Sequence, residues 1–421
     1  MSQSKAGAPG VATTTAGLRG SHWNPDRMPA GITMTAHSLR TEDGAVVTGF
    51  LFKRGGEKTV CCQMHPREMV TTSYLVPEIT QGGCAVWVQG ARSVGNDVRL
   101  EHEAAILDLA AGQRFLREQG FEKRVLVGLS GGAPLASIYN QQARLAGSDR
   151  IKRSPAGKPT DLAEADLPVP DGFVLVSPHL GQGKLLMNCI DPAVIDESDP
   201  LQTNEEISAF NVKNGWKRPP ESASYLAEFL AKYRLAQRAR VERIDAFAYA
   251  AVKKNQEARK RSKESPNRMD AIIGAWSPIF NVWRTDADPR CFDLSLDPSD
   301  RAYGTLWGAN PFASNFGSVG FARVCTPESW LSNWSALSSN ASMEKCAPSL
   351  VQPTLMIQFT GDNSLFPADA ETIFGYIGAS DKTRVEVHGN HQGQAIRADA
   401  PSGQVVAGEH IRSWLGERGF R

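Results

Sequence analysis

The sequence predicts an α/β fold, in which a mostly parallel, twisted sheet has helices on both faces and is interrupted by a mainly helical insertion. Short apolar runs typical of strands alternate with helical patterns from residue 32 to 176, and the alternation resumes at residue 353. Such alternation is typical of a parallel sheet covered on both faces. From about residue 181 to 349 it stops, which predicts a segment of different architecture.

The first part of the predicted sheet begins with an antiparallel hairpin. Residues 32–53 alternate between apolar and polar side chains around the turn sequence Glu42-Asp43-Gly44. The apolar runs and helical spacings that follow predict these elements in order: a strand at 59–64, a helix at 70–79, a strand at 84–89, a helix at 99–119, a strand at 124–127, a helix at 132–145 and a strand at 172–176.

The insertion contains one long helical pattern and a segment rich in aromatic residues. Residues 224–263 carry apolar side chains at helical spacing, and we interpret their strongly basic end at 253–263 as a solvated helix face. Five tryptophans follow, most of which we interpret as packing residues, with one or two lining a pocket: Trp276, Trp283, Trp307, Trp330 and Trp334.

The sheet pattern then resumes. It predicts a strand at 353–359, a helix at 368–377, a strand at 383–387 and a helix at 403–418. We therefore expect four parts: a mobile arm at 1–22, the first part of the core at 23–185, a lid or cap at 186–348 and the second part of the core at 349–421. The arm is rich in Ser, Thr, Ala and Gly and lacks the apolar stretch of an export signal.

The composition of the 421-residue chain bounds its classes of partner. Lys and Arg total 46 and Asp and Glu total 45, a net charge of +1, which favours neither nucleic acid nor an anionic membrane as a partner. No stretch reaches the roughly 18 apolar residues of a membrane span. The seven cysteines are irregularly spaced, so we expect buried thiols in a reducing compartment, and hence a cytoplasmic protein.

One short motif carries chemistry. Gly128-Leu129-Ser130-Gly131-Gly132 lies between an apolar strand and an Ala-rich helical stretch. This is the G-x-S-x-G pattern of a nucleophile elbow, in which a serine hydroxyl stands clear of the sheet at a strained turn. A phosphate-binding loop is disfavoured, because no Lys-Ser/Thr follows the glycines. Ser130 is therefore the predicted nucleophile.

A serine nucleophile needs a base within hydrogen-bond reach and an acid that orients the base. In an elbow of this type the expected chain order is Ser, acid, His. Asp362 follows the strand at 353–359 and His391 follows the last strand, so we predict these two as acid and base. The alternatives are a second histidine as base and two other acids: His388, Asp369 and Asp191. No carboxylate or cysteine has suitable spacing to the His-x-x-His pair at 388–391, so we predict no metal site.

An oxyanion hole requires two N–H donors aimed at the developing charge. The N–H of Gly131, next to the nucleophile, is the first predicted donor. The second is expected from the loop after the strand that ends at His65-Pro66; since Pro66 has no N–H, we predict the N–H of Arg67. Three side chains after neighbouring strands are possible walls of the site: His65, Arg92 and His179.

With these residues in view, the chain resembles the α/β-hydrolase superfamily over residues 32–185 and 346–421. In that family the matching positions serve as nucleophile, oxyanion hole, acid and base, and an inserted segment serves as a lid. Two departures stand out. The turn reads His65-Pro66 where His-Gly is common, and the acid lies five residues before Pro367 where four is usual in many members, which makes Asn363 an alternative for the aligned place.

The resemblance implies a serine hydrolase that needs no cofactor and acts on a small-molecule substrate. The aromatic-rich insertion favours an ester of a small to medium, partly apolar or aromatic compound. Hydrolysis of a carbon–carbon bond in a diketone or ring-cleavage product is the first alternative. A lyase or a non-catalytic binding protein on the same scaffold is the second. A homodimer formed through the lid stays an open expectation.

Overall fold

The computed structural model describes residues 24–69 and 73–421, so the arm expected at 1–22 lies outside the described residues. Its central feature is an eight-stranded sheet in the order β1-β2-β4-β3-β5-β6-β11-β12. Strands β1 and β2 form an antiparallel hairpin, β2 pairs antiparallel with β4, and all later pairings in the sheet are parallel. The mostly parallel sheet predicted from the sequence is confirmed.

The strands match the apolar runs of the sequence closely. The inner parallel strands are covered on both faces and consist mainly of apolar residues, whereas the edge strand β12 is mostly polar and only partly buried. The bounds of the eight strands are Thr33–Arg40 (β1), Val46–Lys53 (β2), Thr59–His65 (β3), Ala85–Gly90 (β4), Lys123–Leu129 (β5), Gly172–Val176 (β6), Thr354–Phe359 (β11) and Lys382–Val387 (β12).

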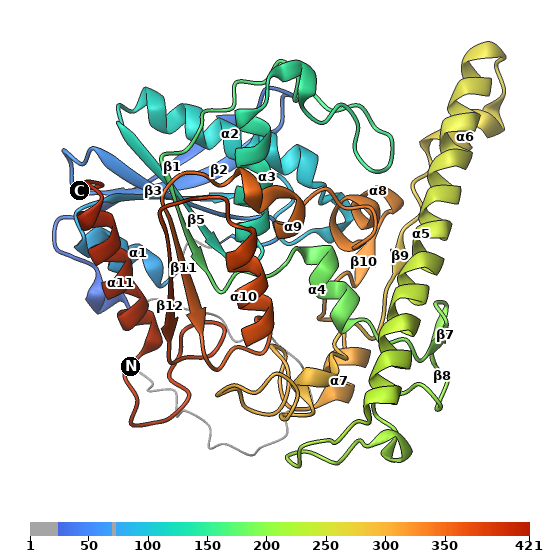
Figure 1. Ribbon diagram of the computed structural model, residues 1–421. Coiled ribbons are helices and arrows are strands. Elements are labelled where there is room, and N and C mark those ends of the chain that lie inside the picture. The colour runs from blue at the N-terminus through green and yellow to red at the C-terminus, as the bar shows by residue number, and fades with distance from the viewer. Residues whose placement is uncertain (1–23, 70–72) are drawn as a thin grey trace, which may run out of the picture.

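Helices cover the sheet on both faces (Figure 1). Helices α1 (Leu75–Gln81) and α11 (Gly403–Glu417) pack on one face, and α2 (His102–Glu118), α3 (Gly132–Arg144) and α10 (Pro367–Tyr376) pack on the other. The neighbouring thiols of Cys61 and Cys62 divide between the two cores. All seven cysteines are buried and free, as predicted from their spacing.

The insertion leaves the sheet after β6 and is dominated by α5 (Ala227–Glu264), a helix of 38 residues that Figure 1 shows on the side remote from α11. Much of the stretch from 276 to 310 has no regular structure. Its other α-helices and strands are α4 (Gln182–Cys189), β7 (Val194–Asp196), β8 (Asp199–Thr203), α6 (Arg268–Ala275), β9 (Phe280–Asn281), α7 (Pro311–Phe316), β10 (Val324–Cys325), α8 (Pro327–Ser329) and α9 (Met343–Cys346).

Irregular backbone can stay buried only if its polar groups are paired. Here arginine side chains supply many of the partners. Arg284 donates to the carbonyl oxygen of Pro200 at 3.2 Å, and Arg240 donates to the carbonyl oxygen of Trp283 at 2.8 Å. No helix in the described part of the chain is long and apolar enough to cross a bilayer.

Two differences from the predicted elements have physical causes. The helix expected from residue 70 begins at Leu75, and residues 70–72 lie outside the described part. Helix α4 is absent from the predicted elements, because eight residues make only about two turns, too few to show a helical period.

The close contact between β5 and α3 predicts an effect of a single methyl group. A Cβ atom on Gly128 would lie 2.6 Å from the Cα atom of Ala133, and backbone cannot move aside cheaply. We expect Gly128→Ala to lower the free energy of unfolding by about 1–3 kcal/mol, measured by urea denaturation. The control is Gly375→Ala in α10, where a Cβ meets nothing within 4 Å and where alanine should stabilise by about 0.5–1 kcal/mol. Equal effects of the two substitutions would contradict this account.

Candidate active site

The site is centred on Ser130, at the turn between β5 and α3. Its φ is 51°, in the left-handed region that costs a non-glycine residue of order 1–3 kcal/mol. Glycines on both sides permit this geometry: besides the contact made at Gly128, a Cβ atom on Gly132 would lie 2.8 Å from the carbonyl oxygen of Met64. The strand–turn–helix geometry expected of the elbow is therefore present.

The structure brings the three predicted residues together in one hydrogen-bonded series. His391 Nε2 lies 3.1 Å from Ser130 Oγ, and His391 Nδ1 lies 2.7 Å from Asp362 Oδ2. The other carboxylate oxygen, Asp362 Oδ1, accepts the N–H groups of Ser364 at 2.7 Å and Leu365 at 3.1 Å. Both oxygens of the acid are thus used, one to hold its own turn and one to hold the imidazole.

Electrostatics favour a base at His391. Burial would lower the pKa of this imidazole, but the charge of Asp362 and its hydrogen bond raise it, and Glu68 contributes in the same direction. The net result is a pKa above the ordinary histidine value. A base of this kind has an increased affinity for the serine proton.

The alternative base lies elsewhere. The side chain of His388 is exposed at the surface, where its Nδ1 lies 3.0 Å from Asp300 Oδ2 and 3.1 Å from the hydroxyl of Thr360. It makes no contact with Ser130.

The alternative acids are also engaged elsewhere. Asp191 pairs with Arg284, and Asp369 accepts from Arg290 at 2.9 Å. The amide of Asn363 donates to the carbonyl oxygens of Ala302 and Gly304 in the insertion. Asn363 therefore holds the acid-bearing turn against the insertion and leaves Asp362 to face the imidazole.

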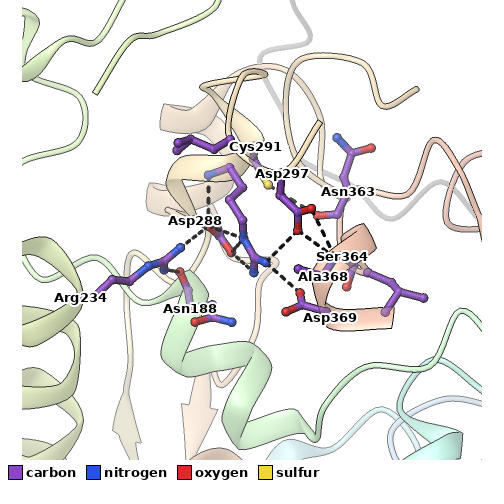
Figure 2. Close-up of polar contacts among 12 residues, drawn as sticks. Asn188, Arg234, Asp288, Cys291, Asp297, Asn363, Ser364, Ala368 and Asp369 are labelled. Carbon is purple, nitrogen blue, oxygen red and sulfur yellow. Dashed lines mark hydrogen bonds and ion pairs between the residues drawn. The ribbon is translucent and has the colours of Figure 1, made fainter. Parts of the chain in front are cut away.

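A cluster of charged residues strengthens this attachment (Figure 2). Arg290, from the insertion, binds Asp288 at 2.8 Å and Asp369 of α10 at 2.9 Å. Asp297, also from the insertion, accepts the N–H of Ala368 at the start of α10 at 3.2 Å. The segment that carries Asp362 is thus joined to the insertion at Asn363 and again at the start of α10.

Ser130 opens into a pocket whose walls come from both parts of the chain. The core supplies most of the polar lining, and the insertion adds Leu306, Phe321 and Trp334. The lining residues are His65, Arg67, Glu68, Leu129, Ser130, His179, Gln182, Leu185, Leu306, Phe321, Trp334, His391 and Gln392.

Two of the three predicted wall residues, His65 and His179, line this pocket, whereas the expectation for Arg92 is corrected. The guanidinium of Arg92 is bound to Asp108 at 2.7 Å and also pairs with Asp43. Asp108 is buried in α2, so it holds Arg92 between that helix and the β1–β2 hairpin, outside the pocket.

The expectation for the Arg67 N–H is also corrected. That group donates to Nδ1 of His65 at 3.2 Å, as does the N–H of Glu68. The side chain of Arg67 pairs with Asp97 at 2.7 Å and lies over the Trp334 ring at 4.9 Å. By contrast, no partner for the Gly131 N–H is found among residues 24–69 and 73–421.

The sequence did not identify the insertion residues of the pocket individually. Of its tryptophans, Trp334 lines the pocket, Trp330 and Trp307 are buried, and Trp276 is exposed. Phe321 gave no signal beyond the aromatic richness of its segment.

The order of the strands, the elbow after β5, the acid after β11 and the histidine after β12 together decide the fold. The chain has the α/β-hydrolase fold. Neither a family model nor a curated protein sequence matches the chain.

Solved structures with similar folds include hydrolases at low sequence identity. DcsB in complex with its substrate analogue is 11% identical, with a TM-score of 0.48, over 91% of this chain and 99% of that one. The α/β hydrolase GrgF from Penicillium sp. is 12% identical, with a TM-score of 0.45, over 92% and 97%. The esterase domain of a Rhodothermus marinus protein is 10% identical, with a TM-score of 0.42, over 91% and 98%.

The contact between Asp362 and His391 predicts a change that needs no substrate to observe. In Asp362→Asn the charge that opposes the effect of burial is lost, so we expect the pKa of His391 to fall below its ordinary value. Titration of the imidazole by NMR measures this. Asp300→Asn, next to the exposed His388, serves as the control and should leave His391 unchanged. An unaltered pKa in Asp362→Asn would remove the carboxylate as the cause.

Proposed function

We propose that this chain is a serine hydrolase that cleaves carboxylic esters of small to medium, partly apolar or aromatic compounds. The observation that carries the proposal is the hydrogen-bonded series from Asp362 through His391 to Ser130, with distances of 2.7 and 3.1 Å. The serine lies at a strained elbow and opens into a pocket.

In this proposal Ser130 Oγ forms a bond to the ester carbonyl carbon while its proton passes to His391 Nε2. The electron pair of the carbonyl π bond moves to oxygen, which becomes an oxyanion. When the carbonyl re-forms, the bond to the alcohol oxygen breaks, and that oxygen takes the proton from His391. Water then repeats the sequence on the acyl-enzyme and releases the acid.

The pocket supports the proposed substrate class. Leu185, Leu306, Phe321 and Trp334 present apolar surface, while Gln182 adds a polar group that can orient a substrate. Leu306, Phe321 and Trp334 belong to the insertion, which we take as the cap at 186–348. Concave sites of this composition suit compounds with an apolar body and few polar groups.

Ser130→Ala is the primary test. It removes the attacking atom, so we expect turnover of an aryl ester to fall about 10³- to 10⁶-fold with unfolding unchanged. A fluorophosphonate should label Ser130 in the wild type, and peptide mass spectrometry locates the label. A well-folded wild type that resists labelling contradicts the proposal. A substrate panel that includes diketones then separates ester from carbon–carbon cleavage.

The two histidines of the last loop form a matched pair. His391→Ala should reduce kcat/KM by several orders of magnitude, whereas His388→Ala should stay within about twofold, since its side chain is outside the pocket. The base must be neutral, so activity is lost as pH falls through its pKa. Because that pKa is raised, we expect the acid midpoint of kcat/KM above pH 6.5. A midpoint below that value, or equal losses in both variants, argues against His391 as base.

A further inference from the structure

The oxyanion hole of the proposed hydrolase lacks an obvious second donor. The N–H of Gly131 is unpaired in the described part of the chain, but the N–H of Arg67 is directed at His65 Nδ1. Proline at position 66 has no N–H. Neither position 66 nor position 67 therefore has a backbone N–H that is free to donate the second hydrogen bond to an oxyanion.

The imidazole of His65 lies where such a donor is needed. Its Nδ1 accepts the N–H groups of Arg67 and Glu68, each at 3.2 Å. A nitrogen that accepts carries no proton, so the neutral ring must carry its proton on Nε2. His65 is only 8% exposed, yet it lines the pocket beside Ser130.

His179 has the same arrangement on the neighbouring strand end. Its Nδ1 accepts the N–H of Gly181 at 3.2 Å, which again places the proton on Nε2. It is 5% exposed and lines the same pocket. In the described part of the chain, neither His65 Nε2 nor His179 Nε2 has a hydrogen-bond partner.

The two Nε2 atoms point at one place. A Cβ atom on Gly131 would lie 2.8 Å from His65 Nε2 and 3.2 Å from His179 Nε2. Both N–H groups thus converge on the residue that follows the nucleophile, and only glycine leaves the space between them open. An oxygen atom beside Gly131 can receive hydrogen bonds from both rings.

We infer that His65 and His179 are side-chain donors of the oxyanion hole, where their Nε2–H groups act together with the Gly131 N–H. The inference rests on the proposed hydrolase function. As Ser130 attacks, negative charge develops on the carbonyl oxygen, and the two imidazoles donate to it without giving up their protons. The N–H of Arg67 then acts through the ring of His65 by fixing which nitrogen is the donor.

Their protonation states suit this role. Burial lowers the pKa of His65 to about 3, helped by the charges of Arg67 and His391. Burial likewise lowers the pKa of His179 to about 3, with His65 and His391 contributing. Both rings are neutral wherever His391 is an active base, so they donate hydrogen bonds and do not compete for the serine proton.

The test replaces each ring by one that lacks the donor. We expect His179→Phe and His65→Phe to lower kcat for an aryl ester about 10²- to 10³-fold with KM changed less than about threefold. Affinity for an aryl trifluoromethyl ketone, which forms an oxyanion on Ser130, should fall in parallel with kcat. His179→Gln can keep an N–H near the Nε2 position and should retain more activity than His179→Phe. His388→Ala serves as the control.

The outcomes separate the inference from the proposed function. Normal kcat and ketone affinity in both phenylalanine variants would overturn the inference, and so would a rise in KM alone, which indicates contact with the ground-state substrate. Phosphonate labelling of Ser130 with thermal unfolding shows that each variant is folded. If the wild type resists labelling, it is the proposed function that fails. His179→Phe is the more decisive variant, because His65→Phe also frees the N–H of Arg67.

Discussion

The site depends on the contact between a carboxylate and a buried imidazole. An imidazole buried as deeply as His391 would lose much of its basicity, and the hydrogen bond to Asp362 at 2.7 Å opposes that effect while turning Nε2 toward Ser130. The carboxylate is itself held by the N–H groups of its own turn, and Asn363 holds that turn against the insertion. The position of the His391 imidazole therefore depends on contacts that run from the sheet into the inserted segment.

The core was predictable because its determinants are local. A buried parallel strand is a short apolar run, and β6 was predicted at its observed bounds. The elbow at Ser130 is readable because glycine is required wherever a Cβ atom would strike the backbone, as at 128 and 132. The order of serine, acid and histidine then follows from strand ends that share one edge of the sheet.

The remaining parts of the site are set by tertiary contacts, which have no local signal. Arg92 and Arg67 both follow strands of the sheet, yet ion pairs with Asp108 and Asp97 decide where their side chains lie. The N–H of Arg67 donates to Nδ1 of His65. This contact depends on the orientation of the His65 ring, which no local sequence pattern indicates. Phe321 reaches the pocket from irregular backbone, where the neighbouring Arg323 donates to the carbonyl oxygen of Val282, and Trp334 reaches it from the end of a short π-helix, Trp330–Trp334.

The contacts of Arg290 and Asp297 with α10 hold the insertion and the core together. Phe366 packs in an apolar cluster made largely of insertion residues, while Arg290 and Asp297 hold the start of α10. The insertion is thus not a detachable module: excising it would strip the partners from the segment that presents Asp362. The core and the insertion should therefore melt as one cooperative unit, although they are separate stretches of the sequence.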